Sequence, residues 1–324
     1  MREIFYVEAL REALREEMRN NPDVFLIGED IGDYGGVFKV TEGLYKEFGA
    51  KRVRQTPISE ATIVGTALGA AIAGMRPICE LMFIDFLPLA GDQIFNQAAK
   101  IKYMTGGQAK VPLVIRTNIG AGRAAAAQHS QSIHAWACHM PGIKVVLPSN
   151  PYDAKGLLKT AINDDNPVLF LEHKFLYRMK GEVPEEDYTI PFGKASIKNE
   201  GTDVTVVAIS SLVNKAMNVS KKLFLEGISV EVIDPRTLIP YDRDAVANSV
   251  KKTGHLVVAD EGYMNCGICS EIAMKVIEDA FFYLEAPIRR VAAPDVPVPF
   301  CPSLEKLCIP DEKNIEKAIK LCIG

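Results

Sequence analysis

The sequence predicts an α/β protein with two tandem doubly wound sheets whose strands are mostly parallel. Short apolar segments typical of buried strands alternate along the chain with longer segments typical of helices, as in parallel sheets covered on both faces. The alternation stops once, between His173 and Gly201, where charged residues and proline predict a linker with brief strand pairing. At 324 residues the chain is long enough for two separate cores.

The elements before the linker follow one another closely. The predicted helices are residues 6–20, 85–104 and 150–163, with two more that start near Thr41 and at Glu60. Asn21-Pro22 ends the first helix, and Ser149-Asn150-Pro151 caps a helix that runs to about Asn163. The predicted strands are residues 24–28, 77–83, 111–116, 145–147 and 167–172, and residues 118–132 are a predicted loop.

The same alternation resumes after the linker. The predicted strands are residues 203–210, 228–233, 255–260 and 288–291. The intervening helices end at Leu225, start after Asp242, start at Gly267 and start near Asp311. This second set predicts a second α/β layer structure.

Charge and cysteine usage narrow the class of protein. The net charge is −4 and the isoelectric point is near 5.8, so neither nucleic acid nor an anionic membrane is an expected partner. No uncharged run is long enough to span a bilayer, and the N-terminal segment MREIFYVEALREAL is amphipathic and charged, unlike a signal peptide. The seven cysteines are scattered and odd in number, so a reducing cytoplasm is the expected location.

One carboxylate stands out against an apolar background. Glu60 is followed by residues 61–75, none of which is charged, and Ser59 is the predicted N-cap. These small and apolar residues predict a helix buried on all sides, and Gly65 and Gly69 leave one flank bare for another backbone. Glu60 is therefore either a first-turn residue that complements the helix dipole or a buried acid held for chemistry.

His129 is the second candidate. It lies in AAAAQHSQS after a predicted strand, where open α/β sheets place ligands, although a lone loop histidine is also often structural. His134 and His139 lack zinc spacing. Cys266-Gly-Ile-Cys269 has no second ligand pair, so these cysteines are interpreted as the start of a helix, with redox or zinc use as the alternative.

The glycine-containing loop after the first strand is not a phosphate-binding fingerprint. Residues 28–36, GEDIGDYGG, fit neither GxGxxG nor a P-loop, and we interpret them as a tight turn beside a site. A non-catalytic nucleotide-binding or electron-transfer module with tandem α/β domains would require such a fingerprint. That function is therefore the weaker alternative.

Several segments together resemble one enzyme family, the beta subunit of the thiamine diphosphate-dependent 2-oxo acid dehydrogenases. This group has pyruvate, branched-chain 2-oxo acid and acetoin members. The resemblance implies a transketolase-like pyrimidine-binding domain over residues 1–180, a linker over 181–200 and a transketolase C-terminal-like domain over 201–324. The matching segments are TPISEATIVGTALGAAIAGMRPICELMFIDF, DQIFNQAAKIKYMTGG, AAAAQHSQSIHAW, PGIKVVLPSNPYDAKGLLKTAI and VIDPRTLIPYD.

The resemblance gives the two candidates chemical roles. Glu60 matches the glutamate that hydrogen-bonds the aminopyrimidine ring of thiamine diphosphate and stabilises its imino tautomer, which then generates the ylide. Ile58, Met82 and Phe86 match residues that pack against this ring; as single apolar residues they would otherwise be ordinary core. His129 matches the histidine that meets the lipoyl group, where it can donate a proton to a dithiolane sulfur as the ring opens.

A potassium site is also implied by the resemblance, mostly through backbone carbonyl groups. The alternative reading of the same residues is a helix end and a turn before Pro167. In the second domain, Cys266-Gly267 replaces a glycine pair common in the family, which leaves the expected fold unchanged. The residues matched to the potassium site are Leu113, Ala161, Ile162, Asp164 and Asn166.

Half of the cofactor site is missing from the sequence. The diphosphate end needs magnesium held by a GDG motif and a downstream Asn, and Gly28-Glu29-Asp30 is not a substitute. The resemblance therefore implies an alpha subunit that holds the magnesium, in a heterotetramer of two alpha and two beta chains. It also implies the lipoyl domain and the subunit-binding domain of a dihydrolipoyl acyltransferase as partners. A self-sufficient transketolase-like synthase would carry the missing half itself.

The substrate is expected to be pyruvate or acetoin. Residues 172–195, EHKFLYRMKGEVPEEDYTIPFGKA, most resemble the acetoin and bacterial pyruvate branches, and Met82 replaces a glutamine of the branched-chain members. We therefore expect an oxidoreductase subunit that cleaves this substrate and passes the acyl fragment to lipoamide in a multienzyme complex. A branched-chain 2-oxo acid is the alternative substrate.

Overall fold

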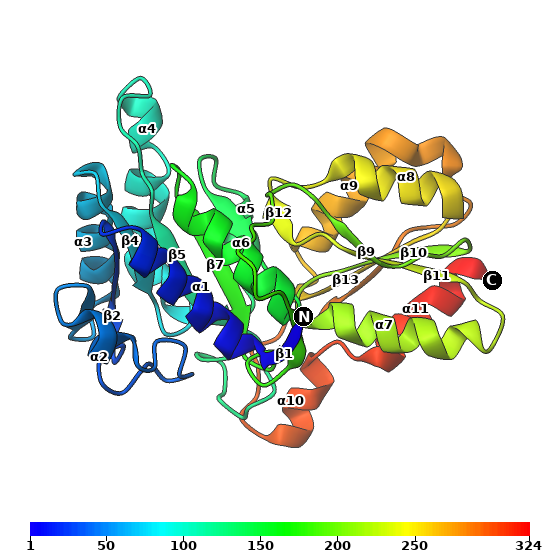
Figure 1. The fold of residues 1–324 in the computed structure, drawn as a ribbon. Helices are drawn as coiled ribbons and strands as arrows, with labels where there is room; N and C mark the ends of the chain where they lie inside the picture. The colour runs from blue at the N-terminus through cyan, green and yellow to red at the C-terminus, as the bar shows by residue number, and fades with distance from the viewer. The chain divides into compact units, whose positions relative to one another are not determined.

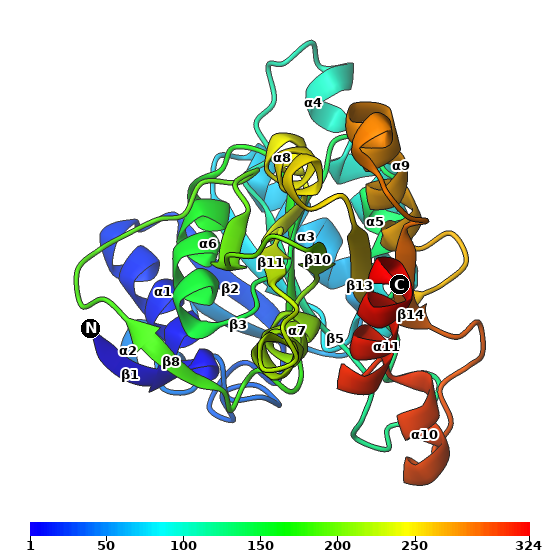
Figure 2. The ribbon, with the colours of Figure 1, turned by 90° about the vertical axis from the view of Figure 1, so that its right-hand side faces the viewer.

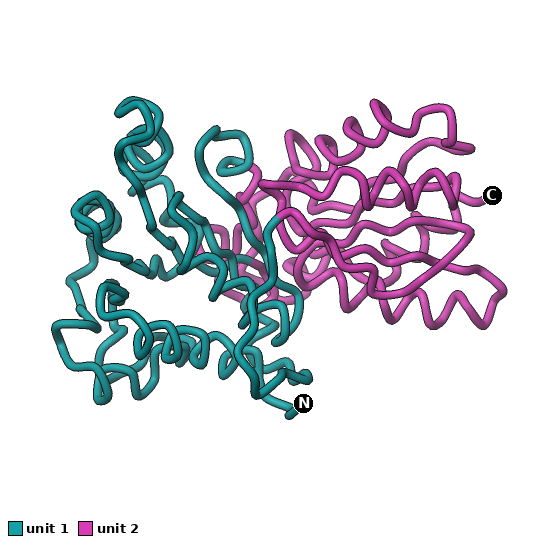
Figure 3. Tube along the Cα trace, turned by 45° about the horizontal axis from the view of Figure 1, so that its top comes forward, with its two compact units in different colours: residues 1–119, 136–192 teal, residues 120–135, 193–324 magenta.

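The chain forms two compact units, described by a computed structural model that covers residues 1–324 (Figure 3). Unit 1 comprises Met1–Ile119 and Trp136–Phe192, and unit 2 comprises Gly120–Ala135 and Gly193–Gly324. Each unit contains a sheet of parallel or mostly parallel strands with helices packed on it. The predicted fold class, two α/β sheets in tandem, is confirmed.

The central sheet of unit 1 has the strand order β6-β7-β5-β4-β2-β3, and every neighbouring pair is parallel. Because the strands run in one direction, their carboxyl ends lie at one edge of the sheet. The strand bounds, in sequence order, are Val24–Glu29 (β2), Val53–Thr56 (β3), Arg76–Glu80 (β4), Val114–Ile119 (β5), Lys144–Val146 (β6) and Val168–His173 (β7).

Helices cover both faces of this sheet (Figures 1 and 2). Tyr6–Asn20 (α1) and Pro151–Asn163 (α6) share a core with one set of strand residues, which includes Leu26, Ile78 and Phe170. The alternate strand residues are also buried, because successive side chains of a strand point to opposite faces. Glu60–Ile72 (α3) contacts β2 and β4.

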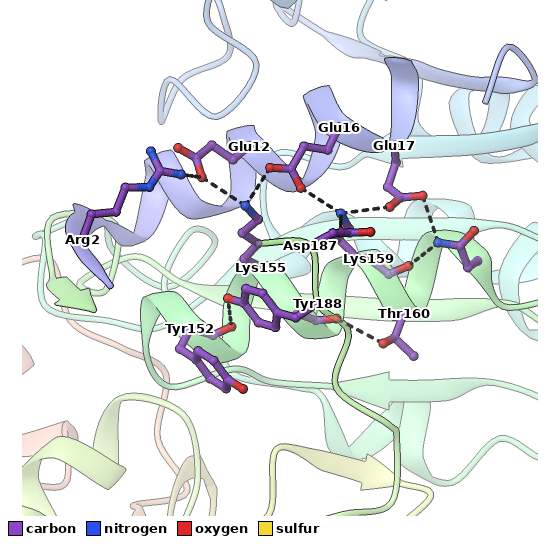
Figure 4. Close-up of polar contacts among 12 residues, drawn as sticks. Arg2, Glu12, Glu16, Glu17, Tyr152, Lys155, Lys159, Thr160, Asp187 and Tyr188 are labelled. Atoms are coloured by element: carbon purple, nitrogen blue, oxygen red, sulfur yellow. Dashed lines mark hydrogen bonds and ion pairs between the residues drawn. The ribbon is translucent and has the colours of Figure 1, made fainter. Parts of the chain in front are cut away.

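Two buried lysines fasten α6 to α1 (Figure 4). Lys155 and Lys159 are 0% and 1% exposed, and their Nζ atoms donate to Oε1 and Oε2 of Glu16, each at 2.7 Å. Glu17 and Asp187 also pair with Lys159. A buried ammonium group is tolerated only when it is paired in this way, so the network fixes the two helices in register.

The predicted linker contains short strands. Lys180–Val183 (β8) pairs antiparallel with Arg2–Phe5 (β1), which confirms the expected brief pairing. Ser196–Asn199 (β9) follows and joins the sheet of unit 2 as an antiparallel strand. The segment is therefore structured at both ends.

Two helix predictions for unit 1 are corrected. Residues 85–104 do not form one helix: they form a 3₁₀ helix over Ile84–Ala90, a π-helix over Asp92–Ala98 and a short α-helix over Ile101–Met104 (α4). Pro88 lies inside the first piece and removes a backbone donor, and Gly91 follows it, so the regular hydrogen-bond ladder is interrupted. The helix expected near Thr41 is Leu44–Phe48 (α2), after Gly43 in a left-handed conformation.

The prediction that α3 is buried on all sides is wrong for this chain. Ile63, Val64, Ala67, Leu68 and Ala71 are buried, but the opposite face is exposed along the helix. A Cβ atom placed on Gly69 would meet no atom within 4 Å. Low side-chain volume therefore marks a face that nothing in this chain covers.

The sheet of unit 2 has the order β14-β13-β10-β11-β9, and only β9 is antiparallel to its neighbour. Ser211–Phe224 (α7) and Glu312–Ile323 (α11) share one core with the sheet, while Arg243–Thr253 (α8) and Ile268–Ala280 (α9) pack on other strand residues and on each other. The remaining bounds are Val204–Ala208 (β10), Val230–Asp234 (β11), Thr237–Ile239 (β12), Leu256–Tyr263 (β13), Phe281–Tyr283 (3₁₀), Arg289–Ala293 (β14) and Pro302–Cys308 (α10).

Two further features concern the length of the helices and the state of the cysteines. Across the chain, no helix has both the length and the apolar character needed to cross a bilayer. All seven cysteines are free; Cys266 is exposed, whereas Cys269 is buried in the first turn of α9, which begins after Gly267 as predicted.

Candidate active site

The predicted cofactor residues follow neighbouring strands at the carboxyl edge of the unit 1 sheet. β2 lies between β3 and β4, with Glu29 in register with Thr56, and Gly28 in register with Glu80. Glu60 follows β3 after a short connection, and Met82 and Phe86 follow β4. The loops that carry these residues therefore leave the sheet side by side.

Glu60 is the first residue of α3, where a negative charge complements the helix dipole. Ser59 occupies the N-cap position, but its hydroxyl donates to Oγ1 of Thr62 at 2.7 Å and does not cap a backbone N–H group. The Glu60 carboxyl is half-buried and makes no hydrogen bond or ion pair with this chain. A half-buried carboxyl group with no hydrogen-bond partner in its own chain can form a hydrogen bond with a bound ligand.

Apolar side chains accompany this acid. Ile58 is 72% exposed, which is unusual for an isoleucine, and Met82 and Phe86 are half-buried. The Phe86 ring meets the Phe83 ring edge-on with 5.9 Å between centroids, so the position of Phe86 is fixed by packing. These residues provide an incompletely covered apolar surface beside the acid.

Sequence reasoning missed two polar residues at this edge. Glu29 ends β2, and its pKa is raised by burial, by the charge of Asp30 and by the charge of Glu60. Asn118 donates through Nδ2 to the carbonyl oxygen of Met82, and its Oδ1 is buried without a hydrogen-bond partner. Each follows or ends a predicted strand, which is the signal that could have found them.

A buried ion cluster lies in the strands behind this edge. Arg116 of β5 donates to Glu80 of β4 at 2.7 Å and to both carboxylate oxygens of Glu172 of β7. The Tyr177 hydroxyl donates to the same Glu172 at 2.8 Å. Burial raises the pKa of Glu172, and the Arg116 charge opposes that shift. The cluster links three strands by charge-assisted hydrogen bonds.

This edge has the chemistry to bind the pyrimidine end of thiamine diphosphate. An unpartnered carboxyl group at Glu60, the unpaired acceptor of Asn118 and the apolar side chains of Ile58, Met82 and Phe86 suit a flat heteroaromatic ring with N–H groups. No group of three or more His, Cys, Asp or Glu side chains is placed to hold a metal ion. The residues at this edge therefore suit the pyrimidine end of the cofactor.

His129 belongs to the other unit, in the segment Gly120–Ala135. This segment has almost no regular structure, and Ala124 and Ala126 adopt positive φ angles of 52° and 61°. His129 itself is half-buried. The predicted loop is therefore confirmed, and the histidine is presented from irregular backbone.

The five residues matched to potassium lie together in unit 1. Arg76 donates through Nη1 to the carbonyl oxygens of Ile162 and Asp164, each at 3.1 Å. Lys102 donates to Oδ1 of Asn166 at 2.7 Å. The helix end and turn before Pro167, the alternative reading, are also present. Carbonyl oxygens that converge on a guanidinium group favour positive charge, and each has a second lone pair.

The family models agree with this architecture. The model described as transketolase, pyrimidine binding domain, matches residues 2–180, and the model described as transketolase, C-terminal domain, matches residues 193–315. A solved structure titled split gene transketolase, inactive beta4 tetramer, has a TM-score of 0.80 and 26% identity, and the match covers 99% of this chain and 98% of that one.

Similarity to individual proteins indicates the family more narrowly than the two domain models do. The chain is 50% identical to the beta subunit of acetoin:2,6-dichlorophenolindophenol oxidoreductase from Bacillus subtilis, over 95% of this chain and 94% of the relative. It is 49% identical to the pyruvate dehydrogenase E1 beta subunit of Rhizobium meliloti, over 97% and 68%. It is 45% identical to the 2-oxoisovalerate dehydrogenase beta subunit of Bacillus subtilis, over 97% of each chain. The chain belongs to the family of beta subunits of thiamine diphosphate-dependent 2-oxo acid and acetoin dehydrogenases.

Proposed function

We propose that this chain binds the pyrimidine end of thiamine diphosphate at the carboxyl edge of its first sheet and acts as the beta subunit of a pyruvate or acetoin dehydrogenase. The observation that carries the proposal is the half-buried Glu60 carboxyl, which has no partner in the chain and stands beside the exposed Ile58. The acid would hold and return a proton at the ring nitrogen. When bound, the cofactor supplies a carbon nucleophile for the substrate carbonyl group.

The surroundings support a dry site around that acid. Met82 and Phe86 would cover the ring and exclude water, and Asn118 fixes the Met82 backbone. Burial raises the pKa of the neighbouring Glu29, and the charges of Asp30 and Glu60 add to that rise. Domain boundaries at residues 1–180 and 201–324, with a linker at 181–200, are part of this proposal.

We further propose an alpha subunit as partner, in a heterotetramer of two alpha and two beta chains. The names of the relatives include a beta designation, which supports a second type of chain in the assembly. That subunit would hold magnesium and the diphosphate, because the sequence of this chain has no GDG motif for them. The assembly would work in the cytoplasm, without a membrane or nucleic acid as partner.

His129 is proposed to meet the lipoyl group of a dihydrolipoyl acyltransferase, whose lipoyl and subunit-binding domains would be further partners. A half-buried imidazole on irregular backbone can serve as a proton donor to a departing sulfur. The proposed potassium site uses Leu113, Ala161, Ile162, Asp164 and Asn166. Two of its carbonyl groups, those of Ile162 and Asp164, accept from Arg76, so a potassium ion would have to use their second lone pairs.

Substrate choice is tested with the reconstituted pair of chains. Turnover of acetoin, pyruvate and 2-oxoisovalerate is measured with 2,6-dichlorophenolindophenol as electron acceptor, with the beta chain alone as control. We expect activity with acetoin or pyruvate and only with both chains. Preferred turnover of 2-oxoisovalerate would support the branched-chain alternative, and activity of the beta chain alone would contradict the half-site. Thermal unfolding in potassium against sodium chloride at equal concentration tests the cation site, because only a selective site gives a difference.

A further inference from the structure

The segment that carries His129 is held by carboxylates of unit 2. The Ala121 N–H group donates to Oε1 of Glu261 at 2.7 Å, and the Gly122 and Ala124 N–H groups donate to Oε1 and Oε2 of Glu305 at 2.7 and 2.9 Å. Glu261 lies in β13, and Glu305 lies in α10. Both acids are buried, at 8% and 2% exposed. Bonds from N–H groups to a carboxylate are among the strong ones.

The other end of the same segment has its own anchor. Nε2 of His134 lies 2.9 Å from Oδ2 of Asp260, and both side chains are buried. Burial lowers the pKa of His134, but the charge and hydrogen bond of Asp260 and the charge of Glu261 outweigh it, so the net shift is upward. Gly262 gives this pair its space, because a Cβ atom there would lie 2.6 Å from Oδ2 of Asp260.

The backbone conformation between the two anchors is not one that this stretch of sequence would adopt by itself. Ala124 and Ala126 lie in the left-handed region, which alanine rarely adopts, and the segment lacks a helix or strand to hold it. Its N–H groups must nevertheless find acceptors when they are withdrawn from water. The buried acids supply those acceptors and thereby select one conformation of the loop.

We propose that Glu305, with Glu261, is a positioning residue that presents His129 for acyl transfer. This inference rests on the proposed role of His129. Glu305 is the stronger anchor, because it uses both oxygens on two N–H groups separated by one residue. Its replacement would release the start of the loop while leaving Glu60 and the unit 1 edge unchanged.

The test uses the holoenzyme assembled with its alpha subunit. Glu305→Gln keeps the shape but sets an amide NH₂ group against one backbone N–H, whereas Glu261→Gln keeps an oxygen for Ala121. We expect transfer to a free lipoyl domain to fall about 10- to 100-fold in Glu305→Gln, with a smaller loss in Glu261→Gln. Dye-linked decarboxylation should change much less. Trypsin should also cut after the exposed Arg123 faster in Glu305→Gln.

Controls separate this inference from the proposed function. Glu271→Gln removes an exposed carboxylate that pairs only with Lys275 one helical turn away, and it should change neither assay. His129→Ala is measured in parallel. Equal loss in both assays for His129→Ala would refute the role of His129 itself. A selective loss in His129→Ala without one in Glu305→Gln, together with unchanged tryptic cleavage, would overturn the positioning role. Assembly is checked by size-exclusion chromatography, and a Glu305→Gln chain that does not assemble would also overturn it.

Discussion

Arg116 grips Glu172 with two parallel hydrogen bonds, from Nε to Oε1 at 2.7 Å and from Nη2 to Oε2 at 2.9 Å, although both side chains are almost fully buried. A third bond joins Arg116 to Glu80 on the next strand. The planar guanidinium group matches the carboxylate geometry, which lysine cannot do. One cation thereby satisfies two acids on opposite sides of β5, directly beneath the proposed cofactor edge.

Replacing Arg116 by Met should therefore destabilise unit 1 strongly. The change leaves Glu80 and Glu172 without their shared cation, and breaking a buried pair from one side costs about 3–5 kcal/mol. Urea unfolding of the isolated chain measures the loss. The double variant Arg116→Met/Glu172→Met should lose less than the sum of the single changes, and strict additivity would contradict the coupling.

Acid should weaken the bond between Asp187 and Lys159. A hydrogen bond from Lys159 lowers the pKa of Asp187 below its ordinary 3.8, with burial as a smaller opposing effect. A lowered pKa in the folded state means that this contribution is complete above pH 3.8 and is lost as the pH falls through the lowered value. Asp187→Asn should reduce the melting temperature at pH 7. The difference from the unaltered chain should shrink near pH 3, and a constant difference would exclude the ion pair as its cause.

Glu60→Gln should remove catalysis and leave the protein folded. The Glu60 side chain has no partner in this chain, so its replacement breaks no internal bond. Loss of a general acid–base group lowers kcat by about 10²- to 10⁴-fold. Dye-linked turnover of the holoenzyme provides the measurement, with Glu3→Gln as a control at an exposed acid near Lys180. Near-normal turnover in Glu60→Gln would refute the assignment.

His129→Ala should separate two activities. In the proposed mechanism, decarboxylation with an artificial acceptor would depend on the unit 1 edge, whereas reductive transfer to lipoamide would also require a proton donor for the leaving sulfur. We expect transfer to fall by about 10²-fold or more and dye-linked turnover to fall far less. His139→Ala, at an exposed histidine outside the loop, is the matched control. A parallel fall in both assays would place His129 at the decarboxylation step or in the fold.

Local patterns were sufficient for most of the helices and strands, and they placed Glu60 at the start of a helix, where α3 begins. The helix at residues 6–20 was predicted because its apolar period is clear and Asn21-Pro22 ends it, and Tyr6–Asn20 is the observed helix. A cap within Ser149-Asn150-Pro151 was also predicted, and the Asn150 side chain is the one that accepts from the Asp153 N–H group, at 2.9 Å. The prediction of an unbroken helix over 85–104 was wrong because it rested on apolar periodicity alone, whereas Pro88 interrupts the hydrogen-bond ladder.

Hydrogen bonds and ion pairs between residues far apart in the chain could not be predicted from the sequence. Glu305 reaches Gly122 across 183 positions, and Arg116 reaches Glu172 across 56, and no local period or spacing records such contacts. The exposed face of α3 was missed for a related reason. An apolar, small-residue helix has the same composition whether its cover comes from the same chain or from another one.

Substitutions at Gly69 test whether another chain covers the exposed face of α3. They should leave the isolated chain stable or more stable, whereas a large side chain should hinder assembly. A Cβ atom at Gly69 meets nothing within 4 Å, and glycine is a poor helix residue, so Gly69→Ala should stabilise the isolated chain by about 0.5–1 kcal/mol. Gly69→Leu should also fold, yet it should block heterotetramer formation if the alpha subunit packs closely on this face. Thr66→Ser, on the same exposed face, adds no side-chain volume and is the control. Unfolding in urea and analytical ultracentrifugation with the alpha subunit give the two readouts. Normal assembly of Gly69→Leu would show that the subunit contacts lie elsewhere.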